Sequence, residues 1–244
     1  MLYFTASAHR SIMTTISANL QAVLTRIDAA ARQYGRDPKD IVLLAVSKTW
    51  PASCVRDAVT AGQRAFGENY VQEGVEKIAE LHELRKLGLQ WHFIGPLQSN
   101  KTRVVAEHFD WVHSLDRLKI AERLAEQRPD SLPPLSVCLQ VNVSDEPTKS
   151  GVSLAEAPAL ARQIAGLPRL QLRGLMAIPE PVDDLSAQRL PFRRLRELYE
   201  QLRADGLPLD TLSMGMSHDL EAAIAEGATL VRVGTAIFGE RNYA

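Results

Sequence analysis

The sequence predicts an α/β protein that folds as one (β/α)8 barrel, the TIM-barrel architecture. Short apolar segments rich in β-branched residues, typical of parallel strands buried on both faces, alternate with amphipathic helical segments. Eight such strand segments fit within 244 residues, a length that suits one closed barrel. An open, doubly wound sheet is the alternative, but no Gly-x-Gly-x-x-Gly motif follows the first strand.

Each element has its own local signal. The first helix is expected from Thr15, where apolar residues recur at helical spacing, to just before Gly35. The run 41–46 (IVLLAV) is the first strand, and a helix follows Pro51. The other strands are predicted at 65–67, 91–95, 111–115, 135–143, 170–178, 211–214 and 229–233. The other helices are predicted over 71–87, after Ser99, over 116–127, from the capping box Ser153-x-x-Glu156, and over 187–204 and 219–226.

No linker or repeat divides the chain, so residues 14–244 are expected to form one domain after a loose extension over 1–13. That extension lacks the features of a signal peptide, and no apolar run approaches the ~18 residues of a membrane span. The net charge of -1 argues against nucleic-acid binding. Two distant cysteines, Cys54 and Cys138, fit a packing role in a reducing cytoplasm. No long apolar helix suggests self-association, so a monomer is expected.

Reactive side chains of such a barrel lie at the carboxyl ends of its strands. Lys48 follows the apolar run of the first strand almost directly. Desolvation disfavours an ammonium group and lowers its pKa, which is what a lysine that forms Schiff bases needs. The alternative is a lysine at a strand end whose stem lies on apolar surface while its amine reaches water.

The last two loops predict an anion site. The segment 213–217 (SMGMS) carries a glycine between two serines and leads into a helix, so its backbone N–H groups are available to a phosphate. Gly234 and Thr235 follow the last strand, and these two loops hold phosphate in many barrels. Asp219 argues against an anion there, and a helix capped by Ser217 with turn glycines is the alternative.

An amine, a phosphate cradle and an arginine together fit pyridoxal 5'-phosphate (PLP), which has an aldehyde, a phosphate and a ring nitrogen. Arg232 lies two residues before Gly234 and is the candidate for the ring nitrogen. A guanidinium only donates hydrogen bonds, so it would leave that nitrogen unprotonated and weaken the ring as an electron sink. The alternative for Arg232 is a salt bridge with a carboxylate inside the barrel.

Seven stretches of the chain, from about Ile41 to Arg241, resemble the YggS/PROSC family of PLP homeostasis proteins. They are LLAVSKTWP, FGENYVQE, WHFIGPLQSNK, VHSLDRLKIAERL, LQVNVSDEPTKSGV, RGLMAIP and LSMGMSHDLEAAIAEGATLVRVGTAIFGER. Their length and order make chance agreement negligible. The helix over 15–34 fits the family less specifically, and the residues before it lie outside the resemblance.

The resemblance implies a barrel like the N-terminal domain of alanine racemase, with an additional N-terminal helix. It implies that Lys48 holds PLP as an internal aldimine and that Lys149 is a second, transient acceptor. It places Arg232 and Asn69 near the cofactor ring. The phosphate-side residues that it implies are Ser213, Ser217, Gly234 and Thr235.

The function expected from this site is binding and delivery of PLP in vitamin B6 and amino-acid homeostasis, with apo PLP-dependent enzymes as recipients. An amino-acid racemase is the alternative, but the sequence shows no dedicated second acid–base group, and Tyr243 in the tail has nothing to hold it as a base. A Schiff-base aldolase for a phosphorylated sugar is a third reading, which predicts a colourless protein.

We expect no catalytic or ligand-binding role for the other polar residues. Three histidines have no metal-ligand spacing and are expected in core or cap positions: His92, His113 and His218. Glu68 and Asp145 are interpreted as solvated loop charges. A solvated outer helix face is expected for Arg193, Arg194 and Arg196. No metal site is predicted.

Overall fold

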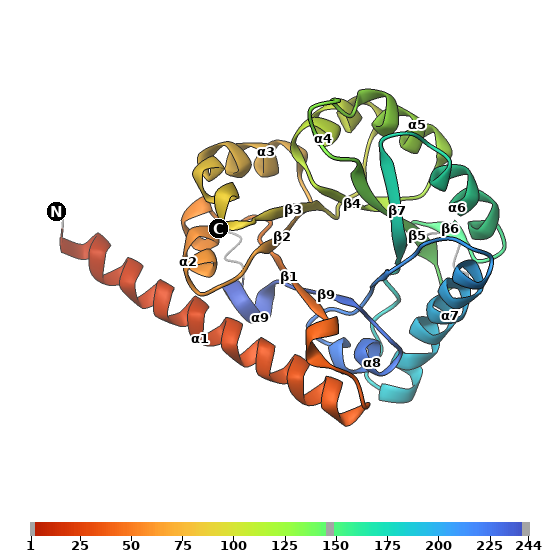
Figure 1. Cartoon of the computed structure of the whole chain (residues 1–244). Helices are drawn as coiled ribbons and strands as arrows, with labels where there is room; N and C mark the ends of the chain where they lie inside the picture. The colour runs from red at the N-terminus through yellow and green to blue at the C-terminus, as the bar shows by residue number, and fades with distance from the viewer. Residues whose placement is uncertain (1–2, 145–148, 241–244) are drawn as a thin grey trace.

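A closed barrel of eight parallel strands, surrounded by helices, forms the computed structural model of this chain (Figure 1). The structure describes residues 3–144 and 149–240, with side chains from Thr15 onward. The strands are β1 (Val42–Val46), β2 (Ala65–Glu68), β3 (Gln90–Phe93), β4 (Trp111–Leu115), β5 (Leu135–Asn142), β6 (Val152–Ser153), β7 (Leu170–Met176), β8 (Thr211–Ser213) and β9 (Leu230–Val233).

The strand order is β4-β3-β2-β1-β9-β8-β7-β5, and a further pairing of β4 with β5 closes the ring. The short β6 lies outside the ring and pairs with β5. The helices are α1 (Tyr3–Gln33), α2 (Ala52–Thr60), α3 (Val71–Glu80), α4 (Thr102–His108), α5 (Leu118–Gln127), α6 (Ala157–Ala165), α7 (Leu185–Ala204), α8 (Leu220–Ala225) and α9 (Thr235–Phe238). Short 3-10 turns occur at Pro38–Asp40, His82–Leu87 and Ser99–Lys101.

All eight predicted strands and the closed barrel are confirmed, with boundaries that differ by three residues or fewer. The predicted helix 71–87 is wrong in its second half, because the chain leaves α3 at Leu81 and continues as a 3-10 turn that ends at Gly88. Only one of the two capping-box bonds is seen, in which Glu156 N–H donates to Ser153 Oγ. The Ser153 hydroxyl itself donates to the Glu156 carboxylate, and α6 starts at Ala157, four residues after Ser153.

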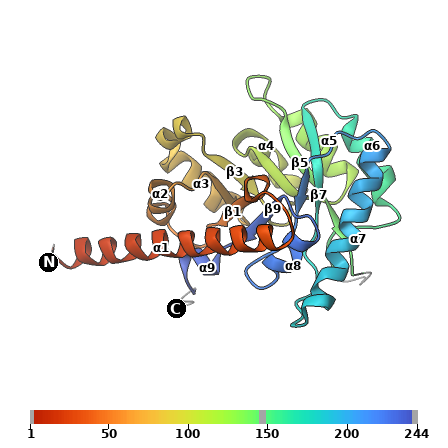
Figure 2. The same cartoon turned by 60° about the horizontal axis from the view of Figure 1, so that its bottom comes forward.

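Helix α1 begins at Tyr3, before the expected start at Thr15, and runs along the outside of the barrel (Figures 1 and 2). One face of it buries apolar residues at helical spacing, namely Ile16, Leu20, Val23, Ile27 and Ala31. This face packs against α2, α8 and α9, and Asn19 donates a 3.0 Å hydrogen bond to the carbonyl of Ile237. The division of the chain into residues 1–13 and one domain over 14–244 stays a prediction.

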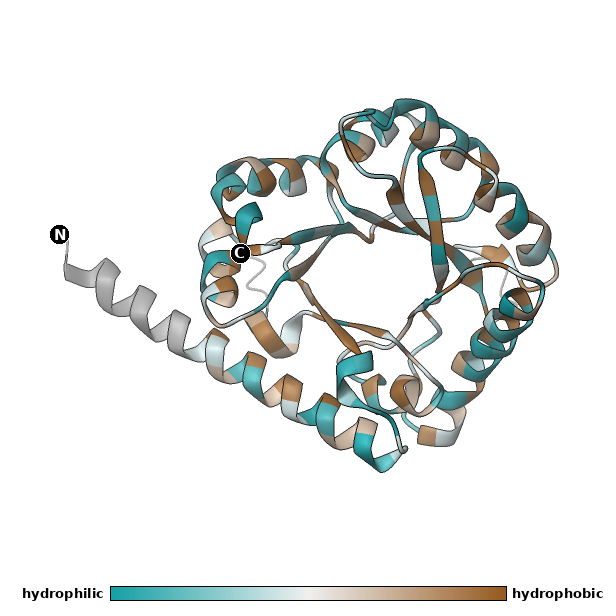
Figure 3. Cartoon of the chain, viewed as in Figure 1, coloured by the Kyte–Doolittle hydropathy of each residue, from teal (hydrophilic) through white to brown (hydrophobic). Residues whose placement is uncertain are grey.

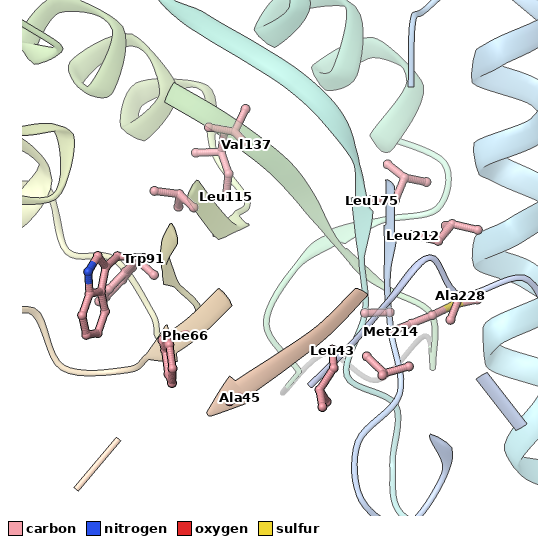
Figure 4. Packing of buried hydrophobic residues seen from close by; sticks show 14 of the residues in the cluster. Leu43, Ala45, Phe66, Trp91, Leu115, Val137, Leu175, Leu212, Met214 and Ala228 are labelled. Atoms are coloured by element: carbon pink, nitrogen blue, oxygen red, sulfur yellow. The ribbon is translucent and has the colours of Figure 1, made fainter. Parts of the chain in front are cut away.

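The main core lies between the strands and the helices. Outward-facing strand residues such as Leu43, Phe66, Trp91 and Val137 are buried there (Figure 4). Figure 3 shows the helices with their apolar residues turned to the strands and hydrophilic residues outward. Removal of this apolar surface from water stabilises the fold by roughly 25 cal/mol per Å², so the helical layer holds the barrel closed.

The interior of the barrel is more polar than this outer core. His92 and His113 are fully buried inside it, and His92 Nδ1 lies 2.9 Å from His113 Nε2. The ring of His92 stacks on Trp111 with 5.2 Å between centroids. Burial lowers the pKa of His92 to about 3 and holds the pKa of His113 well below its ordinary value. Both imidazoles are therefore neutral at physiological pH. Their burial confirms the core position predicted for both.

Strands β7 and β8 approach each other so closely that Gly174 has no space for a side chain. A Cβ at this position would overlap the backbone of Thr211 on β8. Gly166, at the end of α6, offers a matched contrast, because a Cβ there would meet its nearest atom only at 3.6 Å and the φ of -83° suits any residue.

We therefore expect Gly174→Ala to lower the free energy of unfolding by about 3 kcal/mol, because β8 must move away from β7. Gly166→Ala is expected to change it by less than about 0.5 kcal/mol. Denaturant unfolding followed by circular dichroism measures both. Equal stability of the two variants would contradict the close β7–β8 packing.

The two neutral histidines predict a loss of stability in acid. The unfolded chain binds a proton at each histidine below pH 6.5, whereas folded His92 does so only near pH 3, so the free energy of unfolding falls as pH decreases between these values. We expect His92→Gln to flatten this fall by up to about 1.4 kcal/mol per pH unit. His82→Gln is the control, since the His82 side chain is 80% exposed. A profile for His92→Gln that matches wild type would show that His92 is not held neutral.

Candidate functional site

The predicted site residues converge on one end of the barrel. Because all strands of the ring are parallel, their carboxyl ends share one rim, where β2, β1, β9 and β8 are consecutive neighbours. Lys48 follows β1, Asn69 follows β2, the segment 213–217 follows from β8, and Arg232 lies near the end of β9. Residues almost 190 positions apart in the chain thus lie on adjacent strands.

Lys48 is half-buried and sits in a turn directly beyond β1. Its neighbours fix this turn. Ser47 is fully buried, and its N–H donates to the carbonyl of Gly67 at 3.0 Å, which continues the pairing with β2. Thr49 has a φ of +67°, the left-handed conformation that β-branched residues rarely adopt.

A buried ion-pair network, which the sequence reasoning missed, surrounds this turn. Lys77 Nζ on α3 donates to Glu68 Oε1 at 2.8 Å, to Glu73 Oε1 at 2.6 Å and to the carbonyl of Ser47 at 2.7 Å. The interpretation of Glu68 as a solvated loop charge is wrong, because its side chain is fully buried and accepts a 2.6 Å hydrogen bond from Ser47 Oγ. Burial raises the pKa of Glu68, and the Lys77 charge opposes that rise.

Arg232 is a buried cation in the barrel interior, 4% exposed. It donates to the carbonyl and hydroxyl of Ser213, both at 2.6 Å, and to the carbonyl of Ala177 at 2.9 Å. The alternative of a salt bridge is wrong among the described residues, where no carboxylate pairs with it. Burial lowers its pKa to about 10, so the guanidinium keeps its charge at neutral pH.

Ser213 links this arginine to the buried histidines. Its side chain is fully buried, and its Oγ lies 2.8 Å from His113 Nδ1 as well as 2.6 Å from Arg232. A chain of hydrogen bonds therefore runs from His92 through His113 and Ser213 to Arg232. The hydroxyl of Ser213 is engaged in this chain and does not lie open to a phosphate.

The loop after β8 requires its glycine. Gly215 has a φ of +92°, and a Cβ there would lie 2.5 Å from the Cβ of Ala223 on α8. The expectation that Ser217 caps this helix is wrong: α8 starts at Leu220 with Asp219 at its N-cap position. The carboxylate of Asp219 accepts a 2.6 Å hydrogen bond from Met216 N–H, so it occupies one backbone donor of this loop.

Gly234 brings the end of β9 against β1. A Cβ at Gly234 would lie 3.1 Å from the carbonyl oxygen of Val46, two residues before Lys48. Thr235 follows as the exposed first residue of α9. The loop of Gly234 and the turn of Lys48 are therefore direct neighbours at the rim.

Asn69 and Lys149 complete the predicted set. Asn69 is half-buried after β2, and its Oδ1 is shielded from solvent and has no hydrogen-bond partner among the described residues. Lys149 follows β5, and three strands of the ring separate β5 from β1 in either direction. The fold thus gathers Asn69 with Lys48 and leaves Lys149 on the far side of the rim.

The structure has one pocket beside the loop after β8 and a larger one at the opposite end of the barrel. A pocket of about 380 Å³ lies beside the β8 loop, lined by Pro179, Val182, Met216 and His218 among others. A larger pocket of about 700 Å³ opens at the amino ends of the strands. It lies away from Lys48, and its Arg173 and Asp210 pair with each other at 2.6 Å, so we do not assign the chemistry to it.

The remaining candidates have structural roles. Both cysteines are buried and unpaired, which confirms their packing role, and burial raises the pKa of Cys138 to about 12. The arginines on α7 do more than face solvent, because Arg193 and Arg196 pair with the fully buried Glu226 at 3.2 and 2.9 Å. His218 is exposed, so it is not a core residue, and the N-cap position of α8 belongs to its neighbour Asp219. Asp145 lies outside the described residues.

Neither a metal centre nor a membrane span emerges from the described part of the chain. No group of three or more His, Cys, Asp or Glu residues there is arranged to hold a metal ion. None of the helices there combines the length and the apolar character that crossing a bilayer requires.

Comparisons with known proteins agree with this geometry. The family model described as "Alanine racemase, N-terminal domain" matches residues 18–242. The pyridoxal phosphate homeostasis protein of Pseudomonas aeruginosa is 62% identical over 231 residues, which cover 95% of this chain and 98% of that protein. The protein of the same name from Escherichia coli is 58% identical over 232 residues, 95% of this chain and 99% of that protein.

Solved structures show the same relationship. PipY of Synechococcus elongatus with PLP bound is 40% identical, with a TM-score of 0.79 over 92% of this chain and 100% of PipY. Alanine racemase of Corynebacterium glutamicum, 17% identical with a TM-score of 0.66, shares the fold over 94% of this chain and 62% of that enzyme. The chain belongs to the alanine racemase N-terminal domain family and, within it, to the pyridoxal phosphate homeostasis proteins.

Proposed function

We propose that this chain binds PLP covalently through Lys48 and delivers it to apo PLP-dependent enzymes, as part of vitamin B6 and amino-acid homeostasis. The observation that carries the proposal is the position of Arg232, a buried guanidinium without a carboxylate partner among the described residues, at the same rim as Lys48. Buried charges require partners, and a ring nitrogen is an acceptor that suits this donor. PipY, which is 40% identical, has been solved with PLP bound.

The residues present fit the cofactor in other respects. The Oδ1 of Asn69, at this rim, is a buried polar atom that finds no partner in the part of the chain that the structure describes, and a bound ring would cover or contact it. Gly215 and Gly234 allow close approach of backbone to the neighbouring elements, so their loops bring N–H groups to the rim. We assign the phosphate side to Ser217, Gly234 and Thr235, and we assign to Ser213 the orientation of Arg232.

The covalent step belongs to Lys48. PLP supplies an aldehyde that condenses with a lysine amine. The unprotonated Nζ of Lys48 adds to the aldehyde carbon, a carbon–nitrogen double bond forms, and the aldehyde oxygen leaves as water. Lys48 is half-buried at the rim, so its side chain is accessible to the aldehyde from one side. Transfer to Lys149 would need PLP to cross the rim, and its role as a transient acceptor is part of this proposal.

The acid–base groups of this site favour a carrier over a racemase. A racemase needs acid–base groups on both faces of its substrate, and no dedicated second group is identified beside Lys48 among the described residues. Arg232 offers the ring nitrogen only donors, so the nitrogen stays unprotonated and carbanion chemistry is weak. The likeness to alanine racemase at 17% identity concerns the fold. We therefore infer that the chain holds PLP without catalysing amino-acid turnover.

The first test locates the adduct. We expect the protein mixed with PLP to absorb visible light, and borohydride reduction followed by mass spectrometry to place the adduct on Lys48. Lys48→Ala is expected to lose the absorbance while it keeps the circular dichroism and melting temperature of the wild type, since a half-exposed side chain is removed. Lys101→Ala is the control. An adduct on another lysine, or a colourless wild type that favours the aldolase alternative, would contradict the proposal.

The second test separates a carrier from a racemase. The loaded protein is expected to reactivate an apo PLP-dependent enzyme faster than the same concentration of free PLP does. The loaded protein is also expected to exchange the α-hydrogen of alanine in heavy water far more slowly than ~1 s⁻¹, the lower range of enzyme turnover. Exchange at or above that rate would make the chain a racemase, and reactivation no faster than with free PLP would remove the delivery role.

A further inference from the structure

We propose that Glu68, Glu73 and Lys77, here called the lysine clamp, are positioning residues that hold the backbone on both sides of Lys48 and so aim its amine. This inference rests on the proposed attachment of PLP to Lys48. None of the three touches the reacting atoms in the proposal, and they act through Ser47 and Thr49.

The clamp holds Ser47 through both its backbone and its side chain. The carbonyl of Ser47 accepts a 2.7 Å hydrogen bond from Lys77 Nζ, and its hydroxyl donates to Glu68 Oε1 at 2.6 Å. Lys77 and Glu68 are also bonded to each other at 2.8 Å, which closes a buried triangle of charge-assisted bonds. The peptide that precedes Lys48 is therefore fixed to β2 and α3.

The clamp holds Thr49 from the other side. The N–H of Thr49 donates to Glu73 Oε1 at 2.5 Å, and the same oxygen accepts from Lys77 Nζ at 2.6 Å. This bond stabilises a backbone with a φ of +67°, which a threonine does not adopt without support from its surroundings. The turn that carries Lys48 is thus held in a conformation that its own residues disfavour.

Burial and charge make the clamp one unit. The side chains of Lys77 and Glu68 are 6% and 0% exposed, so the ammonium has little hydration beyond its three bonds. Glu73 and Lys77 are four residues apart on α3, which places both on the face that meets β2 and the turn after β1. Removal of Lys77 would leave two carboxylates facing each other without their cation, and Ser47 would lose its donor.

The helix itself supplies a matched control. Glu76 lies on the same helix and bonds Gln72 at 2.9 Å on the exposed side, away from Lys48. Glu73→Gln and Glu76→Gln remove the same charge from the same helix, and only Glu73 contacts the Lys48 turn. A difference between the two variants therefore reports the negative charge at the Lys48 turn, which strengthens the bonds from Thr49 and Lys77, rather than a loss of charge anywhere on the helix.

The experiment follows the rate at which visible absorbance develops after the full-length apo protein is mixed with PLP. We expect Lys77→Met and Glu73→Gln to form the Lys48 adduct about tenfold more slowly than wild type, because a misaimed amine reacts less often. Glu76→Gln is expected to react within about twofold of wild type. Thr49→Asn added to Glu73→Gln is expected to restore much of the rate, since asparagine adopts the left-handed conformation more readily than threonine.

The outcomes separate this inference from the function on which it rests. Borohydride trapping on Lys48 at the wild-type rate in both clamp variants would overturn the clamp and leave the PLP site intact. Trapping on another lysine in the wild type would overturn the site itself.

Melting temperatures identify a variant that does not fold. If Lys77→Met is such a variant, Glu73→Gln decides, because the Glu73 side chain is 27% exposed and its loss is better tolerated. Equal slowing of Glu76→Gln would also overturn the clamp.

Discussion

The parallel pairing of β1 with β9 is the constraint on which the site depends. Its register places Leu44 opposite Arg232 and Ala45 opposite Val233. Gly234 consequently lies against Val46, and the turn of Lys48 lies beside the loop of the last strand. A shift of one residue in this register would send Arg232 out of the barrel interior, because neighbouring strand residues face opposite sides of the sheet.

The interior of this barrel is costly to build. It holds a buried guanidinium, two neutral histidines and, at its rim, an ion-pair network with fully buried Glu68. Each of these groups loses hydration on folding, and hydrogen bonds to carbonyls, hydroxyls and opposite charges replace the lost contacts with water. The apolar layer between strands and helices supplies the stability that such an interior requires.

The likeness to alanine racemase, at 17% identity, concerns the fold. In this chain the barrel brings Lys48, Arg232 and the glycine loops to one rim, at the carboxyl ends of the parallel strands. In this chain the groups next to Lys48 are committed to holding its backbone, since Glu73 and Lys77 bond each other as well as Thr49 and Ser47.

The sequence by itself determined the order of the eight strands along the chain and the barrel, and it placed Lys48, Arg232 and the glycine loops at strand ends as candidates, because these follow from local periodicity and from residues at strand ends. It did not reveal that Ser213 accepts a hydrogen bond from Arg232, that Asp219 rather than Ser217 occupies the N-cap position of α8, or that Glu68 is buried against Lys77. Those features were decided by the tertiary structure alone. A hydrogen-bond partner and the solvation of a charge depend on which elements pack together, and the local pattern of a chain does not encode that neighbourhood.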